Sequence, residues 1–162
     1  MADFEKEFEH EFFDCYARTL PYLIEKASVY IRLRGALLLN ELGADITLEQ
    51  FITLDAIYGC PDLCQRDLAK ILLKDRSNVT RILNILEKKG LIERKTSTKG
   101  NRIVKITTLT NEGRCVMEKY ADTMKNDLNT FLSVFNQEDL RVMEKTLRLI
   151  SQKISENANI QI

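Results

Sequence analysis

The stretch of sequence that decides the fold is residues 65–108, which read QRDLAKILLKDRSNVTRILNILEKKGLIERKTSTKGNRIVKITT. Its apolar residues recur every three to four positions over 65–73 and again over about 77–89, which predicts two short helices. Asp75 suits the start of the second helix and Gly90 suits its end. The two helices are therefore separated by a short turn.

The apolar pattern changes after Gly90 to one that is typical of β-strands. Residues 91–95 and 102–108 favour two short strands. The segment between them is polar, and its closing pair Gly100-Asn101 suits the tip of a hairpin. Two short helices followed by such a hairpin predict a winged helix-turn-helix, which we assign to residues 47–109.

Longer helices are predicted on both sides of this central region. The apolar spacing predicts them over 4–18, from Pro21 to Gly43, from Thr47 to Gly59, from Thr110 to about Phe135, and around 140–154. The chain is thus expected to be mainly α with one small β-hairpin. Residues 1–46 and 110–162 form its helical region.

Two apolar stripes in the helical region have no evident partner inside one small winged-helix core. They are formed by Phe4, Phe8 and Phe12, and by Leu140, Met143, Leu147, Ile150 and Ile154. Exposed apolar area of that extent is unusual for a monomer. We therefore expect a homodimer whose dimerisation helices are the first and the last.

Charge is unevenly distributed along the chain. The 24 basic and 24 acidic side chains cancel overall, but residues 65–105 carry 12 basic and 4 acidic ones, a net charge of +8. Residues 1–64 carry a net charge of −7. The natural partner of the basic segment is an anionic polymer such as DNA.

Several other classes of protein do not fit this sequence. The acidic N-terminus is unlike a signal peptide and the longest apolar run is too short for a membrane span, so we expect a cytoplasmic protein without membrane contact. One His and four Cys without a CxxC pair give no pattern of metal ligands. Neither a His–nucleophile pair nor a Gly-rich phosphate loop indicates an enzyme, and we expect no cofactor.

The outward face of the second short helix carries candidate DNA-binding residues. A helix fits the major groove, where base edges show distinct hydrogen-bond patterns. The candidates are Ser77, Asn78, Arg81 and Asn84. A protruding basic hairpin would meet the sugar–phosphate backbone or the minor groove. Its candidates are Lys99, Asn101 and Arg102. The competing interpretation of both sets is an ordinary solvated surface.

Four motifs follow one another in an order that resembles the MarR family, the multiple antibiotic resistance regulators. They are Leu63–Ala69, Asp75–Leu86, Glu87–Arg94 and Leu109–Gly113, the last similar to the family's LT-x-x-G signature. The resemblance implies a homodimeric winged-helix repressor that binds promoter DNA and is released by a ligand or by thiol oxidation. One departure is that the family's wing usually carries Asp-x-Arg, whereas the Asp is missing before Arg102.

Three alternatives remain open for how such a protein works. The first is release by a small aromatic effector, for which the resemblance indicates a pocket bordered by Tyr22, Tyr30, Phe51 and Tyr58, residues that core packing also explains. The second is redox sensing by Cys60 and Cys64, because Cys64 suits a helix N-cap where the dipole favours a thiolate. The third is a structural dimer whose winged helix binds protein. A symmetric DNA-binding dimer predicts a pseudo-palindromic operator.

Overall fold

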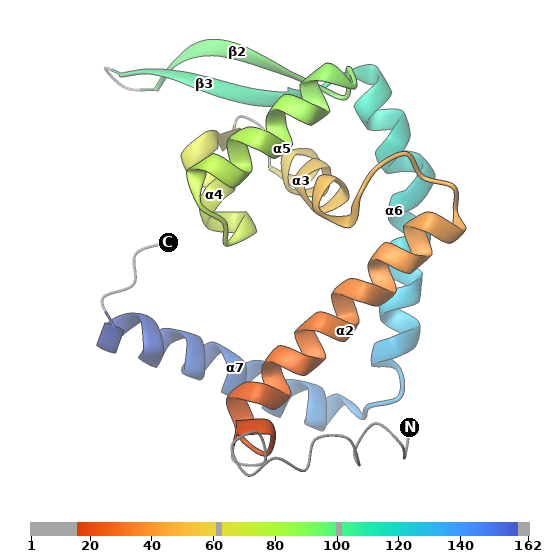
Figure 1. Cartoon of the computed structure of the whole chain (residues 1–162), viewed down its shortest axis with the longest axis vertical. Helices are drawn as coiled ribbons and strands as arrows, with labels where there is room; N and C mark the ends of the chain where they lie inside the picture. The colour runs from red at the N-terminus through yellow and green to blue at the C-terminus, as the bar shows by residue number, and fades with distance from the viewer. Residues whose placement is uncertain (1–15, 61–62, 100–101, 159–162) are drawn as a thin grey trace. The chain divides into compact units, whose positions relative to one another are not determined.

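The structure, a computed structural model, describes residues 16–60, 63–99 and 102–158 (Figure 1). The chain divides into two compact units, Met1–Leu48 and Glu49–Ile162. The helix predicted over 4–18 lies outside the described residues except for its last three.

The first unit is built on one long helix, α2 (Leu20–Glu41). The Thr19 side chain caps its start by accepting a hydrogen bond from the Tyr22 N–H, and Pro21 lies in the first turn, where a missing N–H costs little. The chain leaves the helix through Gly43, whose φ of 64° is a left-handed conformation that glycine adopts readily. The helix predicted between Pro21 and Gly43 is confirmed.

The second unit contains the remaining elements. Its helices are α3 (Leu48–Gly59, whose first residue closes the first unit), α4 (Gln65–Leu72), α5 (Arg76–Lys88), α6 (Asn111–Leu132) and α7 (Gln137–Ala158). Its strands are β1 (Leu63–Cys64), β2 (Ile92–Lys99) and β3 (Arg102–Leu109). None of the helices in the described ranges combines the length and the hydrophobicity needed to cross a membrane.

The sheet is antiparallel, with the strand order β1–β3–β2. The predicted hairpin is confirmed, and β2 continues to Lys99, beyond its apolar part, because the ladder depends on backbone pairing rather than on side-chain polarity. The strand β1 was not predicted. It pairs Leu63 with Thr107 and Cys64 with Ile106, and a two-residue strand is too short to show an apolar period.

The core of the winged helix lies among α3, α4, α5 and the start of β2. Its most deeply buried apolar side chains belong to Leu54, Leu68, Val79, Leu83 and Leu86, each of which is 0% exposed. The helix α4 ends one residue earlier than predicted, because Leu73 adopts a left-handed conformation with φ of 51°. That turn frees α5 to start in a new direction.

A close backbone approach joins the start of α6 to the segment between α5 and β2. The Thr110 N–H donates to the Leu91 carbonyl (3.1 Å), and the Thr110 hydroxyl donates to the Gly90 carbonyl (2.6 Å). The same hydroxyl caps α6 by accepting from the Gly113 N–H (3.0 Å). A Cβ on Gly113 would lie 2.0 Å from the Leu91 carbonyl oxygen. This contact therefore requires glycine.

Candidate nucleic-acid interface

The helix α5 is held at its start by side-chain hydrogen bonds. Asp75 accepts from the Asn78 N–H (2.8 Å) and from the Asn78 side-chain amide (2.6 Å). These bonds, the backbone one foremost, hold the pKa of Asp75 below its ordinary value. The Gln65 amide of α4 donates to the Arg76 carbonyl (3.1 Å) and to the Thr80 hydroxyl. The two helices of the helix-turn-helix are thereby joined through polar contacts.

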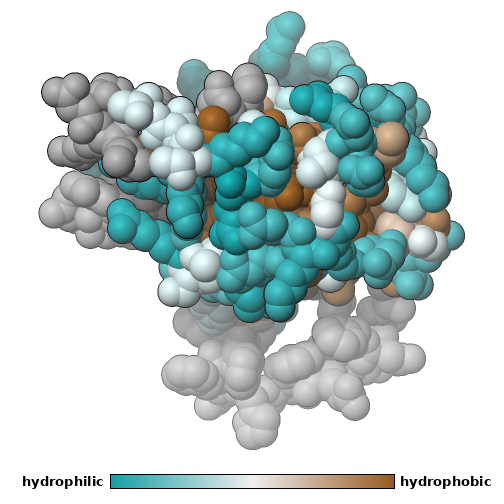
Figure 2. Space-filling view, turned by 90° about the horizontal axis from the view of Figure 1, so that it is seen from above, coloured by the Kyte–Doolittle hydropathy of each residue, from teal (hydrophilic) through white to brown (hydrophobic). Residues whose placement is uncertain are grey.

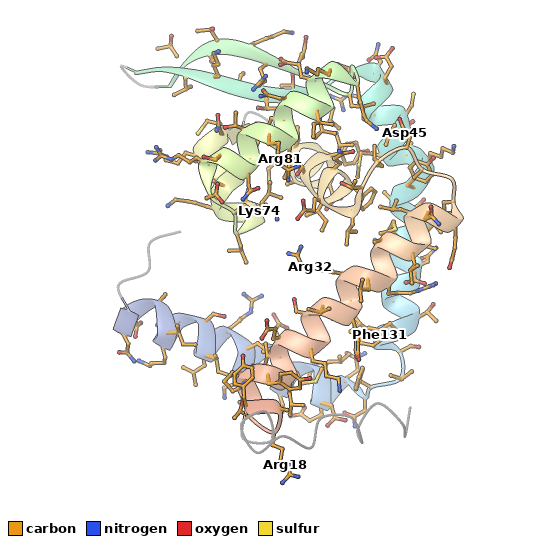
Figure 3. The ribbon with its side chains drawn as sticks, in the orientation of Figure 1. Arg18, Arg32, Asp45, Lys74, Arg81 and Phe131 are labelled. Atoms are coloured by element: carbon orange, nitrogen blue, oxygen red, sulfur yellow. The ribbon has the colours of Figure 1, made fainter. Side chains whose placement is uncertain are left out.

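The two faces of α5 have opposite character. Val79, Ile82, Leu83 and Leu86 are at most 2% exposed and fix one face in the core. The four predicted DNA-binding residues of this helix are all exposed: Ser77, Asn78, Arg81 and Asn84. Three of them, Ser77, Arg81 and Asn84, follow one another at helical spacing and share one side of α5. Figure 3 labels Arg81 on this helix.

The hairpin forms the wing beside this helix. Lys99 and Arg102 are the last residue of β2 and the first of β3, and they pair across the ladder. Asn101 lies outside the described residues. The hairpin lies at the top of Figure 1, and Figure 2 looks down on it from above. Hydrophilic side chains predominate in that view. The helix α5 and the strand β2 both lie within residues 65–105, the segment of net charge +8, which suits a polyanion.

Arg94 of β2 connects the wing to α5. Its guanidinium donates to the Asn84 side-chain oxygen (2.8 Å) and to the Glu87 carboxylate one turn further along the helix. The Arg94 side chain is 22% exposed and that of Glu87 is 40% exposed. The hydrogen bond from Arg94 lowers the pKa of Glu87, and the same contact raises the pKa of Arg94. The sequence interpretation assigned no contact to Arg94, because Glu87 and Arg94 belong to different elements and form no local pattern.

The Glu87–Arg94 pair predicts a pH-dependent contribution to stability. Because the folded-state pKa of Glu87 is lowered, the contribution is present above the ordinary carboxyl pKa and is lost as the pH falls through the folded value. Partial exposure limits it to at most about 1 kcal/mol. Urea unfolding from about pH 7 to pH 3 should show the difference between the wild type and Glu87→Gln shrinking towards acid. A difference that stays constant with pH would contradict this assignment.

The cysteines lie in different environments. Cys64 is the N-cap of α4, as predicted, and its backbone N–H (3.2 Å) and its thiol (2.9 Å) both donate to the Asp67 carboxylate. Reactive cysteines usually have a cationic neighbour, whereas the neighbour here is an acid. Cys60 and Cys115 are exposed. Within the described ranges, no three His, Cys, Asp or Glu side chains gather as metal ligands would.

The four aromatic residues predicted to border an effector pocket are divided between the two units. Tyr22 and Tyr30 belong to α2, where the Tyr22 ring meets the Tyr16 ring edge-on at a centroid distance of 5.6 Å. Tyr30 is 56% exposed. Phe51 and Tyr58 belong to α3, where Phe51 is buried and Tyr58 is 50% exposed.

Comparison of the sequence with known proteins gives two kinds of match, to a family model and to individual relatives. Residues 44–103 match the model of the MarR family. Two uncharacterized HTH-type transcriptional regulators of Bacillus subtilis (strain 168) are similar to the chain. YsmB is 23% identical over 154 residues, which are 95% of this chain and 92% of that protein. YdgJ is 27% identical over 115 residues, which are 71% of this chain and 70% of that protein.

Solved structures match over most of the chain. A Staphylococcus aureus MepR–DNA complex superposes with a TM-score of 0.75 at 26% identity, covering 90% of this chain and 99% of that one. Streptococcus pneumoniae FabT in complex with DNA superposes with a TM-score of 0.65 at 28% identity, covering 87% and 98%. The order of its elements, its capped helix-turn-helix and these matches together show that the chain has a winged-helix fold and that it resembles the regulators of the MarR family.

Proposed function

We propose that this protein is a transcriptional regulator that binds double-stranded DNA through α5 and the wing. The observation that carries the proposal is the two-faced character of α5. Its apolar face is fully buried, while Ser77, Arg81 and Asn84 are exposed on one side of the helix within the basic segment. The DNA complexes of the similar proteins MepR and FabT support the same function.

The proposed contacts divide into two sets. Ser77, Asn78, Arg81 and Asn84 would enter the major groove, where bases are read. The second set is Lys99, Asn101 and Arg102, which would contact the sugar–phosphate backbone or the minor groove of the DNA. Such contacts position the protein on the duplex more than they select its sequence.

The test is selection of bound sequences from random duplex DNA with the full chain, followed by affinity measurements at several salt concentrations. We expect enriched pseudo-palindromes with half-site centres about 10–10.5 base pairs, or a multiple, apart. We also expect the affinity to fall steeply with salt, since each neutralised phosphate releases counterions. Absence of salt-dependent duplex binding would favour a protein partner for the winged helix instead.

We further propose that the protein acts as a homodimer through its terminal helices. In the described part of the chain, α7 leaves apolar side chains exposed at Val142, Met143, Leu147, Leu149 and Ile154. The helix α6 does the same at Leu128 and Phe131 (labelled in Figure 3). Exposing so many apolar side chains to water is unfavourable in free energy. Burying them against a second copy of the chain removes this unfavourable contact with water.

Light scattering after gel filtration should therefore give twice the chain mass at micromolar concentration. The double variant Met143→Glu/Leu147→Glu should shift the protein towards the monomer, because it places charges in the apolar stripe. Lys145→Glu, an exposed polar site on the same helix, is the control and should stay dimeric. A monomeric wild type would contradict the proposal.

We also propose that the protein represses transcription and that a small aromatic effector releases it from DNA. Of the four aromatic residues of the predicted pocket, Tyr30 and Tyr58 are exposed, whereas Phe51 is buried. Tyr30→Ala and Tyr58→Ala therefore test effector release without damaging the core. We expect hydrogen peroxide to leave DNA affinity unchanged, because the Cys64 thiol donates to a carboxylate. Release by peroxide that Cys60→Ser or Cys64→Ser abolishes would establish thiol control instead.

A further inference from the structure

The orientation of the Asn84 amide follows from its contact with Arg94. A guanidinium has only donors, so the group that faces it must be the amide oxygen, and the Arg94 Nη2 to Asn84 Oδ1 distance is 2.8 Å. The amide NH₂ of Asn84 is then the end directed away from Arg94. Asn84 is exposed on the side of α5 that also carries Ser77 and Arg81.

Arg94 is itself anchored. Glu87, on the same helix as Asn84, accepts from the same guanidinium nitrogen. At 22% exposure the Arg94 side chain is largely shielded from water, which would otherwise compete for its hydrogen bonds. The Asn84 oxygen is thus held by a guanidinium that Glu87, one turn further along α5, keeps in place.

This arrangement changes what Asn84 can read in DNA. An unconstrained asparagine pairs with adenine through both ends of its amide, the oxygen accepting from N6 and the NH₂ donating to N7. With its oxygen held by Arg94, the outward end offers donors alone. Guanine presents two neighbouring acceptors, N7 and O6, in the major groove, so donors fit guanine and leave adenine with an unmatched N6 donor.

We propose that Arg94 is a positioning residue that turns the Asn84 amide into a donor-only group, so that Asn84 selects guanine rather than adenine at one base pair of each operator half-site. This inference rests on the proposed DNA-binding function and specifies which base one contact reads.

The experiment is selection from random duplexes with four full-length proteins, namely the wild type, Asn84→Ala, Asn84→Asp and Arg94→Met. The base pair that loses its preference in Asn84→Ala identifies the contact. At that base pair the wild type should favour guanine over adenine by about tenfold. Arg94→Met, which removes the donors but keeps an unbranched side chain, should turn the preference towards adenine. Asn84→Asp still accepts from Arg94 but has no outward donor, so it should lose the guanine preference while remaining folded.

Each contrary result overturns the inference at a different step. Adenine at the Asn84-dependent base pair of the wild type would show that the amide is unconstrained. A guanine preference that survives in Arg94→Met, with equal weakening on all sequences, would make Arg94 merely structural. A guanine preference that survives in Asn84→Asp would exclude the donor role even if Arg94→Met fails to fold. An enriched operator that Asn84→Ala reads unchanged overturns this inference alone, whereas no enriched sequence with the wild type overturns the proposed function as well.

Discussion

Gly113→Ala should destabilise the protein strongly, although it adds only one methyl group. The added Cβ would lie 2.0 Å from the Leu91 carbonyl oxygen. This part of the backbone cannot easily move away, because Thr110 donates hydrogen bonds to the carbonyls of both Leu91 and Gly90. The start of α6 must then move away from Leu91 and lose these hydrogen bonds. We expect a loss of about 3 kcal/mol or more, at the upper end of overpacking effects, and a fall in Tm of roughly 10 °C.

Gly59→Ala is the matched control for this substitution. Gly59 also lies in a helix, but a Cβ there would meet nothing within 4 Å, and its φ is not positive. Thermal and urea unfolding should therefore show little change for Gly59→Ala and a large loss for Gly113→Ala. Equal stability of the two variants would mean that the start of α6 does not lie against the Leu91 carbonyl.

Arg81→Ala should have the largest effect on sequence-specific DNA binding. Arginine is well suited to a bidentate contact with guanine, and Arg81 is exposed on the side of α5 opposite the core. We expect a loss of roughly 1–3 kcal/mol on the selected operator, a much smaller loss on random duplex, and relaxed specificity at one base pair per half-site. Titrations of both duplexes at one salt concentration measure the difference.

Arg102→Ala should behave differently, because a wing contact goes to the backbone or the minor groove. It should weaken operator and random duplex by similar factors and flatten the salt dependence by about one unit of slope. Arg148→Ala is the control, since Arg148 is an exposed residue of α7 that pairs with Glu144. If Arg81→Ala weakens both duplexes equally, Arg81 contacts phosphate and base reading passes to Ser77, Asn78 or Asn84.

The sequence alone was sufficient to predict the helices from α2 to α7, the hairpin of β2 and β3, and the exposed face of α5. Caps such as Asp75 and Thr110 act on N–H groups three residues away, and the apolar residues of a helix recur every three to four positions. Such relations are local, so they can be recognised in a single sequence. The same periodicity that buries Val79 and Leu83 places Ser77 and Arg81 on the other side.

Only the tertiary structure decided which distant groups meet. The pairing of β1 with β3, the approach of Gly113 to Leu91 and the contact of Arg94 with Asn84 each join different elements. Their geometry depends on how the elements pack, and no periodic pattern records it. Residue types and helical spacing therefore marked Asn84 as a candidate for reading bases, but the direction of its amide follows from a guanidinium on a neighbouring strand.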